Sequence, residues 1–319
     1  MLYLTYDIDF QSDGMGAQYQ RIIGIICIAE YYGYKYVHNP IQKMEHLDTQ
    51  SYLKNIEDYF QIYKHYPNIN DQKYDKVIEY DNPSADELSK HANANGNENI
   101  LVKIHIPYNI CDSNVAVYEK SVSNLRNMIT NNSLPFYENN AGLNVAIHIR
   151  RGDVDSVTNA ERYVSMDQLI QVVNVLKTKY NNSKIYIFTQ ITEKNKHEFD
   201  VFNGDNFIVI KDNEDILVTF NHLVNADVLV TCKSSFSYAA GLYNNNAVYY
   251  FDFWHSPLSN WISVNNIEGF DGRHQTGDRE TNMTTNANPS NNILCLPLIL
   301  ILLLFLYKRV KKSRWTVKF

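Results

Sequence analysis

Strand and helix patterns alternate regularly over residues 143–251, and this alternation limits what the chain can fold into. Short apolar runs rich in β-branched residues are typical of buried parallel strands, and each is followed by apolar residues at helical spacing. Strands that alternate with helices of this length predict a doubly wound parallel sheet. The expected strands are 143–149, 184–189, 207–210, 227–232 and 247–251, and the expected helices are 166–180, 193–202, 214–225 (N-cap Asp212 or Asn213) and 234–243.

The N-terminal part of the chain predicts a second α/β unit. Residues 2–8 and 35–38 are expected strands, and helical spacing over 19–32 lies between them, which makes a βαβ unit. Gly33 is expected to follow the helix as its C-cap. The segments 51–63 and 115–129 indicate helices, 100–106 indicates a strand, and the remainder of 41–99 has the polar composition of loops.

Composition divides the chain further. The sequence Asn131-Asn132-Ser133-Leu134-Pro135 breaks the pattern and is the candidate hinge between an N-terminal domain, 1–140, and a C-terminal domain, 141–268. Residues 269–292 are polar and indicate a flexible stalk. They are followed by an apolar run, 293–307, and a basic tail, 308–319.

The apolar run 293–307 predicts a C-terminal membrane anchor. As a helix it spans roughly 22 Å at about 1.5 Å per residue, against a bilayer core of about 30 Å. Bilayer thinning and snorkelling of Lys308 and Arg309 can cover the difference. Because the first residues do not form a signal peptide, we expect a single-pass anchor with the body of the chain in the cytosol. The positive-inside rule would instead keep the basic tail there, and a buried terminal helix is the other alternative.

Charge and cysteine content restrict the function classes. The formal net charge is −6, and six of the 29 basic residues lie in the last twelve positions, so the body is strongly acidic. An acidic body argues against a nucleic-acid partner, because no broad basic face meets the phosphate backbone. The four cysteines are scattered without a C-x-x-C pair, which indicates free thiols in a reducing compartment rather than a metal or disulfide framework.

Arg150-Arg151-Gly152-Asp153 directly follows the expected strand 143–149. Two adjacent guanidiniums and a carboxylate have no packing reason to end a buried strand, and ligands of open α/β sheets bind at that edge. Arginine pairs with phosphate through two parallel hydrogen bonds and stays charged at any working pH. We therefore interpret this loop as an anion site for a phosphate-bearing ligand; the alternative is a strand end with solvated charges.

A second anion-friendly feature follows the expected strand 227–232. Lys233-Ser234-Ser235-Phe236 opens the helix expected over 234–243. Serines at a helix start cap free N–H groups or, together with those groups, bind an anion. Two such features at the same edge of one sheet favour a phosphate site over simple capping.

The order of three motifs resembles the α-1,2/α-1,6-fucosyltransferase superfamily over about residues 1–252. The motifs are Gly14-Met15-Gly16-Ala17-Gln18, His148-Ile149-Arg150-Arg151-Gly152-Asp153 and Ser234-Ser235-Phe236-Ser237, of which the second is the most specific. The resemblance implies a GT-B-like α/β fold, in which two Rossmann-like doubly wound domains face a cleft. Residues 1–140 would be the acceptor side and 141–268 would bind a nucleotide sugar. It implies inverting transfer of L-fucose from GDP-fucose to a glycan hydroxyl, without a metal or other cofactor.

The resemblance also implies roles for single residues. Arg151 would hold the β-phosphate and Arg150 would assist it or brace the loop, so Arg151→Ala is expected to abolish turnover with the fold intact. Asp153 would be the general base or would orient the arginines. His148 would position the nucleotide, Ser234, Ser235 and the N–H of Phe236 would contact the phosphates, and Gly14, Gly16 and Gln18 would line the cleft.

Some alternatives stay open on the sequence. Asp155 and Glu161 are also within reach of the loop as bases, and Trp254 and Trp261 either pack at the sheet end or line an acceptor groove. The donor can be another nucleotide sugar, or the chain can be an inactive glycan- or nucleotide-binding module. A nicotinamide-dependent oxidoreductase is disfavoured, because the dinucleotide fingerprint needs a third glycine near Tyr19.

Overall fold

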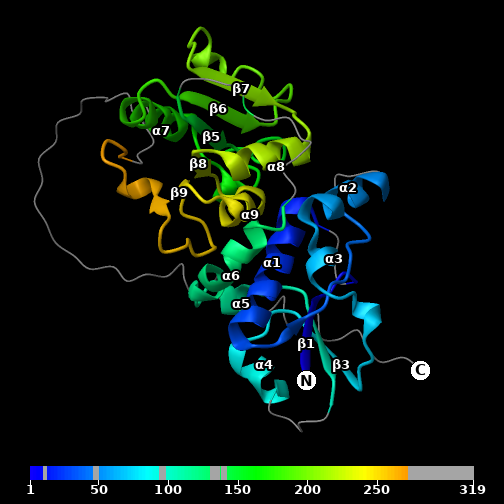
Figure 1. The fold of residues 1–319 in the computed structure, drawn as a ribbon. Coiled ribbons are helices and arrows are strands. Elements are labelled where there is room, and N and C mark those ends of the chain that lie inside the picture. Colours follow the sequence, from blue (N-terminus) through cyan, green and yellow to red (C-terminus); the bar gives the residue numbers. More distant parts are fainter. Residues whose placement is uncertain (10–12, 46–49, 93–97, 130–136, 138–141, 272–319) are drawn as a thin grey trace, which may run out of the picture. The chain divides into compact units, whose positions relative to one another are not determined.

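A computed structural model describes residues 1–9, 13–45, 50–92, 98–129, 137 and 142–271. These residues belong to one compact unit, Met1–Gln275, which contains two parallel sheets with helices packed on them (Figure 1). The mixed α/β fold with two parallel sheets, expected from the sequence, is confirmed.

The first sheet has four parallel strands in the order β2-β1-β4-β3. The chain leaves β1 through the glycine turn and enters the long helix α1, whose C-cap Gly33 has the left-handed conformation (φ 76°) that was expected of it. The elements are β1 (Leu2–Tyr6), α1 (Met15–Tyr32), β2 (Lys35–Tyr36), α2 (Gln50–Phe60), α3 (Ile62–His65), β3 (Lys76–Tyr80), α4 (Ala85–Ala92), β4 (Ile100–Ile104), α5 (Tyr108–Cys111) and α6 (Ala116–Arg126).

The second sheet has six parallel strands in the order β10-β9-β8-β5-β6-β7. Counted from β5, the first three strands proceed to one side and the next three to the other, which is the doubly wound Rossmann order. The elements are β5 (Asn144–His148), α7 (Met166–Lys179), β6 (Lys184–Thr189), β7 (Ile208–Asp212), α8 (Ile216–Asn225), β8 (Val228–Thr231), α9 (Ser235–Tyr243), β9 (Ala247–Tyr250) and β10 (Ile262–Ser263).

Alternate residues of the central strand β5 pack in two different apolar clusters, one on each face of the sheet. Val145 and Ile147 of β5 pack in one apolar cluster with α7, whereas Ala146 packs in the other with α8 and α9. Because successive side chains of a strand point to opposite faces, both faces of this sheet are buried. Figure 1 shows α7 on one side of β5–β8, and α8 and α9 on the other.

Some sequence-based expectations were wrong in detail. The loops expected in the remainder of 41–99 contain β3 and α4, and α5 was not predicted. The helix expected over 193–202 consists of turns that end in a short 3-10 helix, Asp200–Phe202. The N-cap of α8 is Asp215, whose carboxylate accepts from the N–H groups of Leu217 and Val218, rather than Asp212 or Asn213.

The expected hinge at 131–135, most of the stalk 269–292 and the whole of 293–319 lie outside the described residues. Within the described ranges, no helix is both long and apolar enough to cross a membrane.

Candidate functional site

The Arg-Arg loop and the serine turn lie at the switch point of the second sheet. β5 and β8 are neighbours, but the chain leaves them in opposite directions, so the loops at their carboxyl ends separate. Ligands of doubly wound sheets bind in the crevice that forms there. Residues 149–153 follow β5 and residues 232–235 follow β8, so the expectation that both anion-friendly features share one sheet edge is confirmed.

A contact between His148 and Cys232 joins the two loops. The Nδ1 atom of His148 lies 3.1 Å from the Sγ atom of Cys232, and the imidazole packs against the ring of Phe236 at 5.3 Å between centroids. Burial, together with the charge of Arg150, lowers the pKa of His148 to about 3. Burial raises the pKa of the Cys232 thiol. Both groups are therefore neutral at physiological pH, and they position the loops rather than supply charge.

The depressed pKa of His148 predicts a loss of stability in acid. Between the unfolded value of 6.5 and the folded value of about 3, the unfolded chain binds a proton that the folded chain does not. Stability therefore falls as the pH falls from 6.5 toward 3, by at most about 1.4 kcal/mol per pH unit from this residue. Urea denaturation at several pH values should show a shallower fall in His148→Gln. An equal slope in the wild type and His148→Gln would contradict the assignment.

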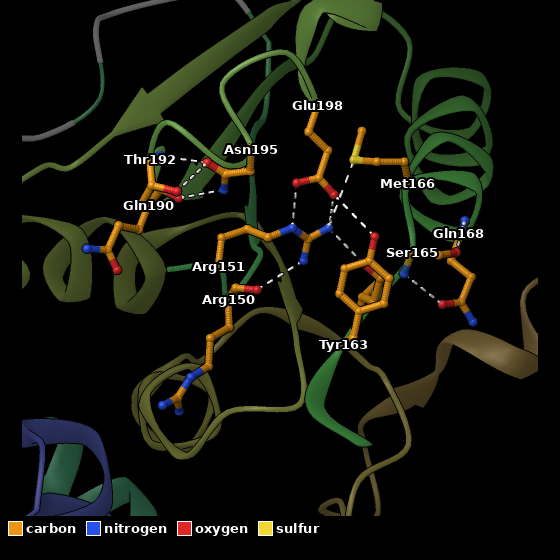
Figure 2. A network of polar contacts seen from close by, with 11 residues as sticks. Arg150, Arg151, Tyr163, Ser165, Met166, Gln168, Gln190, Thr192, Asn195 and Glu198 are labelled. Atoms are coloured by element: carbon orange, nitrogen blue, oxygen red, sulfur yellow. Dashed lines mark hydrogen bonds and ion pairs between the residues drawn. The ribbon is translucent and has the colours of Figure 1, made fainter. Parts of the chain in front are cut away.

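Arg151 is buried and its guanidinium is held on several sides. Nε and Nη2 donate to the two carboxylate oxygens of Glu198 at 2.8 and 2.7 Å, and the side chain is only 2% exposed. Nη2 also donates to the carbonyl oxygen of Val164, and Nη1 donates to that of Arg150. The guanidinium carbon lies 4.5 Å from the ring centre of Tyr163 (Figure 2). Arg151 therefore fastens the loop to its surroundings and fixes the backbone of Arg150.

Arg150 points away from this network (Figure 2). Its side chain is 27% exposed, and it pairs with Asp153 through Nε at 3.0 Å and Nη2 at 2.5 Å. The guanidinium holds the pKa of the Asp153 carboxyl below its usual range. Of the two arginine side chains, that of Arg150 is the more exposed, at 27% against 2%. Asp153 orients Arg150, and its lowered pKa makes it a weak proton acceptor.

The serine turn is a capped helix start. Ser234 is the N-cap of α9, and its Oγ accepts from the N–H of Phe236 at 3.3 Å. Ser234 is 1% exposed, whereas Ser235 and Phe236 are partly exposed. The cap thus uses the Ser234 hydroxyl and the Phe236 N–H that were expected to meet phosphate. Ser235 is partly exposed and lies at the N-terminal end of α9, where the helix dipole is positive.

The glycine motif brings the start of α1 against the start of α9. A β-carbon at Gly16 would lie 2.3 Å from Cα and 2.5 Å from N of Phe236, so only glycine fits there. Gly14 is the N-cap of α1. The Gln18 side chain is buried, and its amide donates to the carbonyl oxygens of Asp13 and Lys43 at 2.6 and 2.9 Å. Gly16 therefore allows the start of α1 to pack against the serine turn, and Gln18 ties α1 to the segments that contain Asp13 and Lys43.

Gly16→Ala is expected to lower the free energy of unfolding by about 1–3 kcal/mol, which is typical of an added methyl group in a full site. The added carbon meets backbone atoms of Phe236, which cannot rotate away. Chemical denaturation followed by circular dichroism measures the change. A wild-type midpoint would show that α1 and α9 do not meet in this way.

Sequence reasoning missed Glu198, Tyr163 and Gln190. Glu198 lies 47 residues after Arg151 in a segment that was expected to be helical, so no local spacing connects the two. Gly152 has a φ of +84°, which favours glycine, and a β-carbon there would displace the flexible end of the Gln190 side chain, whose Oε1 would lie 2.1 Å away. The glycine after the arginine pair was the one local signal of such a turn.

A cavity of about 530 Å³ lies between the Arg-Arg loop and residues 192–198. Its lining includes Arg151, Gly152, Tyr163 and Glu198. It does not include Arg150 or the serine turn, so of the residues expected to bind phosphate only Arg151 lines this cavity.

Comparisons with known proteins give weak structural likenesses. No protein-family model and no curated protein matches the sequence. Among solved structures, POFUT1 in complex with GDP-fucose is similar at a TM-score of 0.47 and 11% identity, over 79% of this chain and 98% of that chain. The Escherichia coli heptosyltransferase WaaC with ADP gives 0.42 and 11%, over 85% and 97%. The NodZ α-1,6-fucosyltransferase soaked with GDP-fucose gives 0.38 and 12%, over 76% and 92%. These likenesses are too weak to assign a family.

Proposed function

We propose that this protein is a glycosyltransferase that takes its sugar from a nucleoside diphosphate sugar. One observation carries the proposal: the accessible guanidinium of Arg150 and the start of α9 lie together at the switch point of a doubly wound sheet. A diphosphate carries negative charge, and Arg150 and the helix N-terminus both favour an anion.

The arrangement suits the chemistry of glycosyl transfer. When the bond between the sugar and the diphosphate breaks, negative charge develops on the leaving phosphate. Fixed positive groups and oriented N–H groups stabilise that charge in the transition state. In this proposal Arg150 contacts the β-phosphate, and Ser235 with the first turn of α9 contacts the diphosphate. Arg151 and His148 keep the two loops in place. This assignment exchanges the roles that the family resemblance implied for the two arginines.

The donor and the reaction follow from the motif resemblance. The His148-to-Asp153 motif points to GDP-fucose, inverting transfer and no metal requirement, with a glycan hydroxyl as the acceptor. The second sheet's half, 141–268, would bind the donor and 1–140 would face the acceptor. Asp153 is assigned to orienting Arg150, because a carboxylate with a lowered pKa is poorly suited to take up the hydroxyl proton.

A panel of nucleotide sugars tests the proposal. GDP-fucose, GDP-mannose, UDP-glucose and ADP-glucose are incubated with the full chain, and released nucleoside diphosphate is measured. Release from GDP-fucose in excess of the other donors supports the assignment. Release from a different donor only would keep a glycosyltransferase and reject fucose. Binding of GDP without release from any donor would indicate an inactive binding module, and neither binding nor release would reject the proposal.

A further inference from the structure

Trp254 is an exposed aromatic side chain on the same sheet edge as the proposed phosphate site. It follows β9, the neighbour of β8, so it lies beyond the carboxyl end of the next strand in the sheet. The residue is 49% exposed, whereas Trp261 is 7% exposed and packs against Gly241. The sequence left two interpretations for these tryptophans, packing at the sheet end or lining an acceptor groove. Trp261 packs in the core, whereas the exposed side chain of Trp254 can contact a ligand.

Although it is exposed, the Trp254 side chain is held in place by contacts with His255 and Phe253. Its Nε1 donates to Nε2 of His255 at 3.1 Å. The His255 side chain is fully buried, and its Nδ1 lies 3.0 Å from Oδ2 of Asp112, at the C-terminal end of α5. The ring of Phe253 lies 3.7 Å from that of Trp254, between centroids. An apolar ring that is fixed by a buried hydrogen-bond chain and still open to solvent is pre-organised for contact.

Arg162 connects this ring to the Arg150–Asp153 pair. Its guanidinium carbon lies 4.8 Å from the centre of the Trp254 ring, and its charge contributes to the lowered pKa of Asp153. The Arg162 side chain is 31% exposed, and its Nε lies 3.8 Å from Oε1 of Glu161. The surface around Trp254 thus combines a half-exposed aromatic ring with the partly exposed guanidinium of Arg162, near the Arg150–Asp153 pair.

We propose that Trp254 and Arg162, which lie in the donor-binding half, bind the sugar ring of the acceptor that meets the donor, so that the acceptor would contact both halves. A pyranose has a face of C–H groups that packs on an indole and hydroxyls that accept from a guanidinium, and this surface offers both. An acceptor ring at Trp254 would also bring its hydroxyl toward the diphosphate side of the site. The inference rests on the proposed glycosyl transfer, since it names the substrate subsite for that reaction.

The test measures sugar binding directly by saturation-transfer NMR. The probes are the methyl β-pyranosides of glucose, galactose and N-acetylglucosamine, added to the wild-type chain and to Trp254→Leu and Trp254→Phe. Saturation transfer to the ring protons of at least one probe is expected with the wild type. Its Kd should be about tenfold weaker in Trp254→Leu and less affected in Trp254→Phe, which keeps an aromatic ring. Circular dichroism checks that both variants are folded.

Two results would overturn the inference: no transfer to any probe with the wild type, or equal Kd values for wild type and Trp254→Leu. GDP is titrated against the same proteins as a separate arm. If Trp254→Leu loses GDP affinity and GDP displaces the probes, the ring contacts the donor base and the acceptor subsite is rejected. If the wild type binds sugar but not GDP, the proposed donor fails while the sugar subsite stands.

Discussion

Replacing Arg150 with alanine is expected to lower donor turnover by about 10²–10³-fold, the usual cost of removing one donor that stabilises developing negative charge. The fold should survive, because Arg150 is partly exposed and its pair with Asp153 is half-open to solvent. Such pairs contribute about 0–1 kcal/mol to stability. Release of GDP from GDP-fucose gives the rate, and thermal unfolding gives the stability.

Arg150→Lys is the matched variant, because it keeps the positive charge and loses the planar fork that pairs with two phosphate oxygens. Its activity should lie between those of the wild type and Arg150→Ala. Wild-type turnover in Arg150→Ala, with GDP-fucose or with the donor that the panel identifies, would remove Arg150 from the reaction.

Arg151→Ala is expected to destabilise the fold by about 3–5 kcal/mol, as is typical when one partner of a buried ion pair is removed. The side chains of Arg151 and Glu198 are 2% and 16% exposed, so the carboxylate would be left largely buried without its partner. Glu198→Ala should cost a comparable amount, because it leaves the guanidinium unpaired. Urea denaturation of both variants measures the loss.

The double variant Arg151→Met/Glu198→Leu separates structure from catalysis. Replacing both members of a buried pair with apolar residues is often neutral, so its stability should recover relative to the single variants. If Arg151 only fastens the loop, the double variant should recover much of the turnover as well. If the double variant recovers its stability but its turnover stays reduced by about 10²–10³-fold, Arg151 rather than Arg150 would be the residue that contacts the β-phosphate.

The sheet edge and its motifs could be predicted because they are local in sequence. An apolar run such as Leu143–Ile149 shows where a strand ends, and the residues that follow it must lie at the carboxyl edge. Gly33 was predictable as a C-cap for the same reason, since only the adjacent helix determines it. The strand order is not local, but alternation of strands and helices restricts it strongly.

The division of roles between Arg150 and Arg151 could not be predicted, because it depends on a distant partner. Arg151 is buried because it pairs with Glu198, and Glu198 lies in a segment of turns that was expected to be a helix. The strand β3 was missed for a different reason. None of its residues is buried, so it lacks the apolar alternation by which strands are recognised.

Calorimetric titration with GDP and GMP tests the central claim most directly. If Arg150 holds the β-phosphate at the switch point, the wild type should bind GDP more tightly than GMP by about 10- to 100-fold, the value of one or two hydrogen bonds to a charged group. Arg150→Ala should bind the two nucleotides almost equally. Equal affinities for GDP and GMP in the wild type, or a preference for GDP that is undiminished in Arg150→Ala, would contradict the claim that Arg150 holds the β-phosphate.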